Sequence, residues 1–207
     1  MKYHFTIFIL PLFLIGCNKP DLLSINPEKQ QIIALQPLDH FTQPELFTLR
    51  NILSDYFQKQ VIVLPPVQVP ASFMNKEINE YSADSLITML SGLKHDSVVE
   101  IIGLTHHKLY TLKYNDSIRQ YYYDEGIFGF SLQPGNACVI SDYKFKTNNE
   151  KLYNRRVKNT ILHEVGHNMG LPHCTAVCIM SENYGNLVVL NSTDGDYCCG
   201  CRKKLDK

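Results

Sequence analysis

The sequence His163-Glu164-Val165-Gly166-His167 places two histidines four residues apart. In a helix, residues four apart lie on the same face, one turn apart, so both imidazoles can bind one metal ion. Glu164 lies beside them and is a candidate general base for a metal-bound water molecule. The residue types and their spacing therefore indicate metal-assisted hydrolysis.

A turn and a third histidine follow this segment. Gly170 comes three residues after His167 and can adopt the left-handed conformation that stops a helix and turns the chain back. Pro172 prevents the helix from resuming. His173, ten residues after His163, can complete a three-histidine site with one position left for water.

Cysteines are concentrated near the end of the chain, where the last 34 residues hold five of the seven. Cys198 and Cys201 have the C-x-x-C spacing that lets two thiolates share one tetrahedral ion. A second close pair, Cys174 and Cys178, completes a set of four ligands. In an exported protein the same cysteines can instead pair as disulfides, so the residues alone leave both alternatives open.

The complete pattern resembles that of the archaemetzincins, zinc metallopeptidases of the metzincin clan. Their signature has HExxHxxGxxH followed by cysteines and a methionine, which match Cys174, Cys178, Met180 and Cys198. The resemblance is tight over residues 162–201 and weaker upstream. The chain departs from the signature at one point, because three residues separate Cys174 from Cys178 where the family has four.

The resemblance implies a role for each of these residues. His163, His167 and His173 match the ligands of a catalytic zinc, and Glu164 matches the general base and acid. Met180 matches the methionine of a turn beneath the zinc site. A second, structural zinc is implied, which makes two zinc ions per chain; its ligands are Cys174, Cys178, Cys198 and Cys201.

We therefore expect a zinc metallopeptidase that hydrolyses peptide bonds in peptide or protein substrates. Zinc lowers the pKa of a bound water molecule to about 7, and Glu164 would take its proton and pass it to the leaving amine. Two alternatives stay open: a zinc-binding envelope lipoprotein without activity, and a disulfide-stapled binding module. The intact Glu164 argues against the first, and the three-histidine pattern argues against the second.

The N-terminus resembles an export signal. An apolar run at residues 5–15 is too short to span a bilayer comfortably but suits a secretory signal. The following Cys17 ends the sequence LIGC, which resembles a bacterial lipobox. We expect a signal peptide at 1–16, a tether at 17–30 and a lipid on Cys17. The protein would then be a membrane-anchored lipoprotein of the bacterial cell envelope.

Composition favours one folded domain. Of the 207 residues, 44% are hydrophobic and 19% are charged, which is a globular balance. Lysine and arginine number 20, as do aspartate and glutamate, so the basic excess typical of nucleic-acid binding is lacking. We expect no nucleic-acid partner, and a monomer.

The order of predicted elements indicates a mixed α+β fold. We expect a metzincin-like single domain over residues 31–207, with a twisted mixed sheet, an active-site helix and a small cysteine-rich, zinc-binding part at 174–201. Predicted strands lie at 31–35, 61–64, 98–104, 108–113, 127–132 and 137–141, and predicted helices at 44–58, 84–90 and 150–169.

Four other segments are predicted to have structural or solvent-exposed roles. Residues 67–81 show no clear period and are expected to form a long loop. His106 and His107 are expected to be exposed in a loop, and tyrosines 121–123 to be sheet residues, with lining of the cleft as the alternative. The basic segment 202–204 is expected to be a solvated end.

Overall fold

The computed structural model describes residues 31–182, 185–192 and 195–205. The predicted signal peptide 1–16, Cys17 and the tether 17–30 lie outside the described residues. The strands are Ile32–Pro37 (β1), Gln60–Val63 (β2), Met74–Asn75 (β3), Glu80–Ser82 (β4), Val98–Thr105 (β5), Leu109–Asn115 (β6), Gln120–Ile127 (β7), Gly129–Ser131 (β8) and Ala137–Ser141 (β9). The helices are Gln43–Phe57 (α1), Ala83–Leu93 (α2), Glu150–Asn168 (α3), Leu187–Ser192 (α4) and Cys199–Leu205 (α5), with a short 3-10 turn at Ala71–Phe73.

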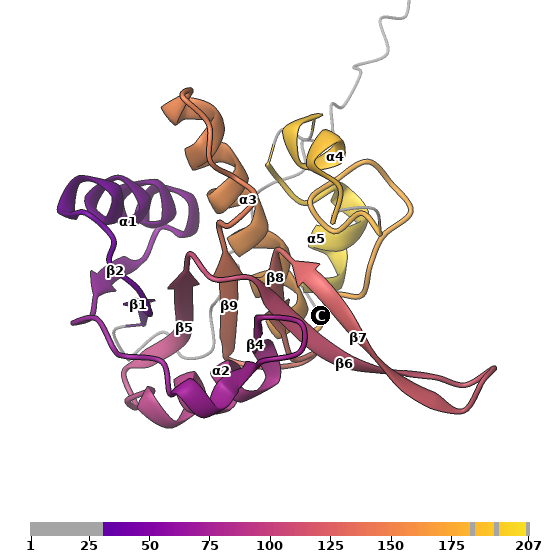
Figure 1. The fold of residues 1–207 in the computed structure, drawn as a ribbon. Helices are drawn as coiled ribbons and strands as arrows, with labels where there is room; N and C mark the ends of the chain where they lie inside the picture. The colour runs from indigo at the N-terminus through magenta and orange to yellow at the C-terminus, as the bar shows by residue number, and fades with distance from the viewer. Residues whose placement is uncertain (1–30, 183–184, 193–194, 206–207) are drawn as a thin grey trace, which may run out of the picture.

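The main sheet has five strands in the order β2-β1-β5-β9-β8. The first four are parallel, and β8 at the edge runs antiparallel to β9. Helices α1 and α3 lie on one face of this sheet and α2 lies on the other, which gives three layers (Figure 1). The sheet is mixed and the helices cover both faces, so the predicted α+β class and single domain are confirmed.

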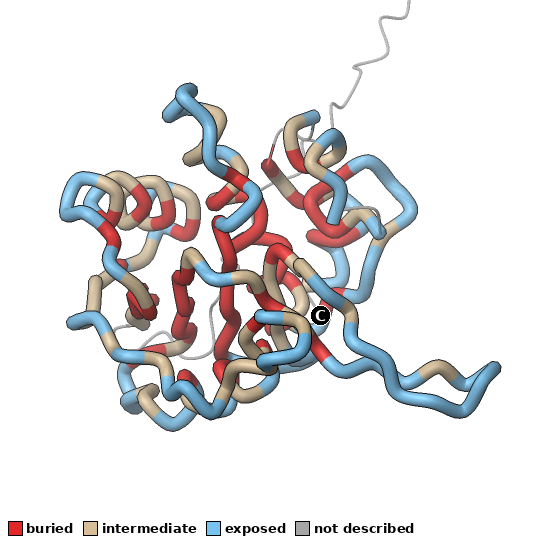
Figure 2. Tube along the Cα trace, in the orientation of Figure 1, coloured by how far each residue is buried: buried red, intermediate tan, exposed pale blue. Residues whose placement is uncertain are grey.

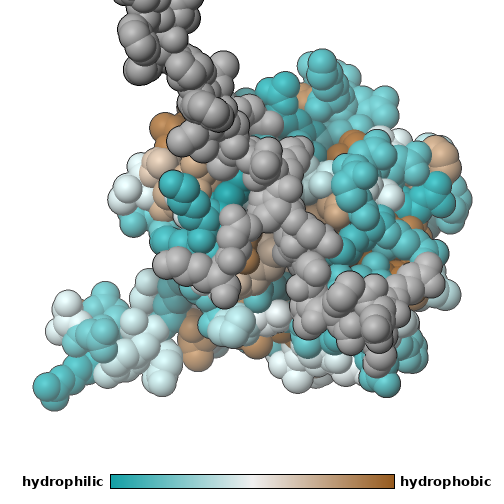
Figure 3. Space-filling view, turned by 180° about the vertical axis from the view of Figure 1, so that it is seen from behind, coloured by the Kyte–Doolittle hydropathy of each residue, from teal (hydrophilic) through white to brown (hydrophobic). Residues whose placement is uncertain are grey.

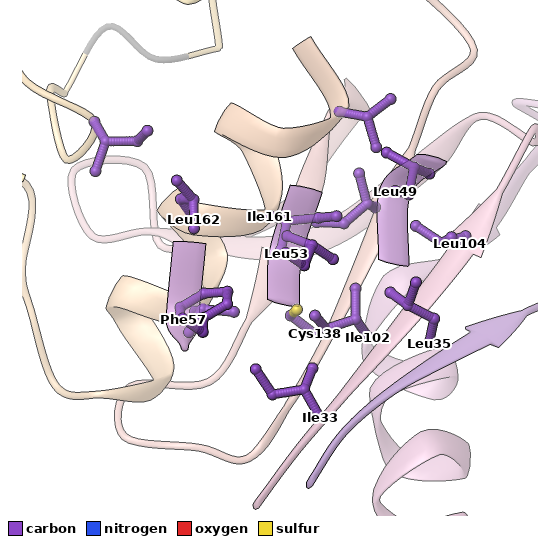
Figure 4. Close-up of a cluster of buried hydrophobic side chains, with 14 of the residues drawn as sticks. Ile33, Leu35, Leu49, Leu53, Phe57, Ile102, Leu104, Cys138, Ile161 and Leu162 are labelled. Carbon is purple, nitrogen blue, oxygen red and sulfur yellow. The ribbon is translucent and has the colours of Figure 1, made fainter. Parts of the chain in front are cut away.

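Alternating residues of the central strands supply the core on both faces of the sheet. Ile33 and Ile102 pack toward α1 and α3, whereas Ala34 and Ile101 pack toward α2. Burial is concentrated in these strands and in the part of α3 that crosses them (Figure 2). Cys138 lies among aliphatic side chains in this core (Figure 4). Burying each large aliphatic side chain contributes about 1.5–3 kcal/mol, so this layer positions α3 firmly.

A second sheet of four strands, in the order β3-β4-β6-β7, corrects the expectation of a single sheet. Strand β3 and the first two residues of β4 lie in the segment 67–81, which the sequence predicted to be a loop. They are too short to show a period. Strands β6 and β7 form a long hairpin that projects from the body (Figure 1). From behind, hydrophilic and near-neutral residues cover its outer part (Figure 3).

The helix that carries the histidines has clear start and stop signals. Asn149 caps α3, because its side-chain oxygen accepts a hydrogen bond from the backbone N–H of Leu152. The helix ends at Asn168, and Gly170 follows with a φ of +89°. A glycine reaches this conformation without steric cost, as the sequence predicted. No described helix has both the length and the apolar sequence that crossing a bilayer requires.

Candidate functional site

The three predicted histidines come together at the C-terminal end of α3. His163 and His167 lie one turn apart on the helix, and the chain turns back after Gly170 to bring His173 beside them. The Nε2 atom of His167 lies 3.1 Å from Nε2 of His163 and 3.2 Å from Nε2 of His173. The three nitrogens therefore face one another.

Backbone carbonyls fix the orientation of two of these rings. Nδ1 of His163 lies 2.7 Å from the carbonyl oxygen of Ile179, and Nδ1 of His167 lies 2.8 Å from that of Leu171. A carbonyl only accepts, so each Nδ1 carries the proton and each Nε2 presents a lone pair. Converging lone pairs repel unless they share a cation, and neutral imidazole nitrogens are ligands that zinc prefers. The donor set therefore fits a metal ion.

Burial keeps His163 and His167 neutral. It lowers the pKa of His163 to about 3, and the nearby His167 and His173 act in the same direction. Burial also lowers the pKa of His167. Because a metal ligand must be unprotonated, these two histidines are ready to bind a cation at neutral pH without first losing protons.

Glu164 points its carboxylate at strand β8 and is only 7% exposed. The Ser131 hydroxyl donates a hydrogen bond of 2.7 Å to its Oε2 atom. Burial raises the pKa of Glu164 to about 7, and the hydrogen bond from Ser131 acts against this. A carboxyl with a pKa near neutrality can both accept and return a proton, which is what a general base and acid requires.

Met180 lies beneath the histidines and is fully buried. Its sulfur contacts Gly166, the residue just before His167, so closely that a Cβ at this position would overlap it. The same turn supplies the Ile179 carbonyl that orients His163. The segment that contains Ile179 and Met180 therefore packs against α3 next to two of the predicted ligands, His163 and His167.

The four predicted cysteines form a second cluster. The Sγ atoms of Cys174, Cys178, Cys198 and Cys201 lie within 4.8 Å of one another. The six cysteines of the described residues form no disulfide, so the disulfide-stapled alternative is not favoured. The shorter Cys174–Cys178 spacing does not prevent assembly, because the backbone N–H of Cys174 bonds to the carbonyl of Met180 at 2.6 Å and closes the loop.

A cleft of about 560 Å³ opens onto the histidines and Glu164. Its far wall is made by the hairpin residues Thr111, Lys113 and Asp124 and by the edge strand β8. Lys113 and Asp124 form an ion pair of 2.5 Å across the hairpin. The tyrosines at 121–123 lie in β7 and are exposed, outside the residues that line this cleft, so they are sheet residues as predicted.

His106 and His107 lie in the loop after β5 and do not join the site. His107 is exposed, as predicted, whereas His106 is half-buried. His106 Nδ1 lies 2.8 Å from Asp142, and this hydrogen bond raises the pKa of His106. His107 Nε2 lies 2.9 Å from Asp39. These contacts tie together the loops that follow β1, β5 and β9. The sequence did not indicate them, because the partners are far apart along the chain.

Comparison with known proteins identifies the family. The sequence profile described as peptidase family M54 matches residues 50–207, which is most of the chain. The chain belongs to peptidase family M54. The expected archaemetzincin resemblance is thereby confirmed, and the M54 chain is a zinc metallopeptidase.

Relatives and solved structures of archaemetzincins support this assignment. The archaemetzincin of Archaeoglobus fulgidus is 27% identical over 174 residues, which cover 84% of the M54 chain and 98% of the relative. Its crystal structure, complexed with malonate, covers 84% of the chain and 99% of its own, with a TM-score of 0.68 and 25% identity. The crystal structure of the archaemetzincin of Methanopyrus kandleri has the same fold, with a TM-score of 0.71 at 24% identity, covering 88% of this chain and 97% of that one.

Proposed function

We propose that this M54 protein hydrolyses peptide bonds at the cleft, with zinc held by His163, His167 and His173 and with Glu164 as general base and acid. The observation that carries this proposal is the convergence of three histidine Nε2 atoms beside a buried carboxylate. Zinc, when bound there, supplies Lewis-acid activation of water and of the peptide carbonyl. The substrates are peptides or proteins that enter the cleft.

The protein's own residues carry the proton transfers. The Glu164 carboxylate takes a proton from the attacking water and delivers it to the nitrogen of the leaving amine. Its pKa of about 7 suits both transfers near neutral pH. The backbone carbonyls of Ile179 and Leu171 hold the rings of His163 and His167 in the tautomer that presents Nε2.

A second zinc at the four cysteines would have a structural role. Four thiolates fill a tetrahedral site and leave no position for substrate, so this ion would support folding rather than catalysis. The cluster links the chain after His173 to α5, and thereby holds the segment that contains Met180. We propose two zinc ions per chain on this basis.

The test compares two variants in which a buried glutamate is replaced. Glu164→Gln should retain zinc but lose at least about 99% of its activity on peptides that the wild type cleaves, because general base catalysis contributes about 10²–10⁴-fold. Glu100→Gln is the matched control, since Glu100 is 2% exposed but lies outside the cleft. If Glu164→Gln kept full activity, Glu164 would not be the general base. If the zinc-loaded wild type cleaved no peptide, the proposed peptidase function would be wrong.

We also propose export and lipid anchoring through Cys17, supported by the apolar run at 5–15 and the LIGC sequence. Radiolabelled palmitate should be incorporated into the full chain expressed in a bacterium, and Cys17→Ser should abolish the label. The same labelling in Cys17→Ser would contradict the proposal. We also propose that the anchored protein lies in the bacterial cell envelope and that it is a monomer.

A further inference from the structure

The Glu164 carboxylate is held between two residues of the edge strand β8. Ser131 donates to Oε2 at 2.7 Å, which is the hydrogen bond that the described residues give to this carboxylate. On the other side, a Cβ at Gly129 would lie 2.8 Å from Oε1, so the carboxylate packs directly against the bare backbone of Gly129. The two contacts engage different oxygens.

Ser131 and Gly129 lie on a rigid element. They belong to the same three-residue strand, and β8 pairs with β9 through Ser131↔Cys138 and Gly129↔Ile140. Both partners are fully buried in the core layer beneath α3. The Ser131 hydroxyl and the Gly129 backbone are therefore held by strand pairing, and not by a loop, in a fixed position relative to α3, which carries Glu164.

We propose that Ser131 is a positioning residue for the general base, orienting the Glu164 carboxylate so that Oε1 takes the proton from water. The Ser131 hydroxyl donates its hydrogen bond to Oε2. Oε1 lies in the space that a side chain at position 129 would fill. Without the hydroxyl, the carboxylate can rotate about its terminal torsion, which is soft. This inference rests on the proposed function, because it presupposes that Glu164 is the base.

The kinetic test uses three variants of the zinc-loaded protein. Ser131→Ala should lower kcat by tenfold or more while KM changes by less than twofold, because orientation of the base matters in the transition state and not in substrate binding. Ser131→Thr keeps the hydroxyl and should restore kcat to within about threefold of the wild type. Ser54→Ala is the control. Ser54 is also partly buried and donates to the Lys59 carbonyl just after the end of α1, and it does not line the cleft, so kcat of this variant should be unchanged.

A spectroscopic test is independent of activity. The infrared carboxylate band of Glu164 is identified as the band that is lost in Glu164→Gln. This band should shift in Ser131→Ala, because a hydrogen bond to one oxygen is removed, and should stay in place in Ser131→Thr and Ser54→Ala.

The outcomes separate this inference from the proposed function. If the wild type cleaves peptides and Glu164→Gln does not, but Ser131→Ala keeps its kcat and its band position, the positioning role is wrong and the function stands. If Ser131→Thr is as slow as Ser131→Ala, the hydroxyl is not what matters and the role is also wrong. If the wild type is inactive, the function itself fails.

Discussion

The sulfur of Met180 lies directly against Gly166, on the side of α3 that faces away from the cleft. Glycine is an unfavourable residue within a helix, where it costs about 1 kcal/mol relative to alanine. At Gly166 the absence of a Cβ is what allows the turn with Met180 to approach the helix between Glu164 and His167. The carbonyl of Ile179, next to Met180, then reaches His163.

Gly166→Ala should therefore weaken zinc binding at the histidines and lower the melting temperature, despite the better helix propensity of alanine. The added methyl displaces Met180 and with it the Ile179 carbonyl that orients His163. Competition with a zinc chelator and thermal unfolding measure the two effects.

Gly92→Ala in α2 is the control, because a Cβ there meets no atom within 4 Å. It should leave stability unchanged or raise it by up to about 1 kcal/mol. Equal behaviour of the two variants would contradict the account.

The sequence predicted the ligands of the site because they are close together along the chain. His163, His167 and His173 span eleven residues, and a single helix with one turn after it determines their arrangement. Ser131 and Gly129 lie more than 30 residues before Glu164, and only the pairing of β8 at the sheet edge brings them to it. No local pattern of residues could have indicated this contact.

The main sheet and α3 were predicted for a similar reason, since runs of apolar residues and helical periodicity are local. The predicted helix 150–169 differs from α3 by one residue. The hairpin was predicted in part. Strand β6 was expected at 108–113, whereas for β7 only the tyrosines at 121–123 were expected to be sheet residues, because side chains on both faces of β7 are exposed and leave no period of two. The basic segment 202–204 was expected to be solvated. Arg202 is instead only 5% exposed, because it pairs with Asp196 and donates to the carbonyl of Tyr197. The run of basic residues by itself does not indicate these partners.

Glu100 should make stability depend on pH. It is buried in β5, and burial raises its pKa to about 8, although the hydrogen bond from the Asn168 side-chain amide, at 2.6 Å, acts against this. Between its ordinary value of 4.5 and about 8, the folded protein binds a proton that the unfolded chain has released. This contribution to stability is therefore complete below pH 4.5 and is lost as pH rises through 8.

Glu100→Gln removes this titration and should flatten the decline of the melting temperature between pH 4.5 and 8 relative to the wild type. Thermal unfolding across this window measures the difference between the two proteins at constant zinc. Glu77→Gln, which changes an exposed carboxyl, should follow the wild-type curve. If Glu100→Gln also follows the wild-type curve, Glu100 is ionised in the folded protein and the account is wrong.

Arg202 should contribute more to stability than its neighbours in the basic tail. Its Nη2 atom pairs with Asp196, and its Nε donates to the carbonyl of Tyr197 at 3.1 Å. Asp196 also accepts a hydrogen bond of 2.8 Å from the Tyr56 hydroxyl on α1, so this network attaches the tail to the first helix. Arg202→Ala should lower the free energy of unfolding by about 1–3 kcal/mol. Lys203→Ala, which removes an exposed charge, should change it by less than about 0.5 kcal/mol.

Thiol reactivity should report the second zinc separately from the first. Among the described cysteines, Cys199 is exposed and should react at once with a thiol reagent, whereas Cys138 is buried in the core and should react only on unfolding. The four clustered cysteines should be protected by zinc and become reactive together when a strong chelator removes it. A fragment that begins at Asn18 avoids any reaction at Cys17.

A weak chelator should first abolish activity without exposing thiols, because the histidine site opens onto the cleft through His173, which is exposed. Release of four thiols before activity is lost would reverse this order and contradict a closed structural site. Reaction of all four thiols without chelator would show that they hold no zinc.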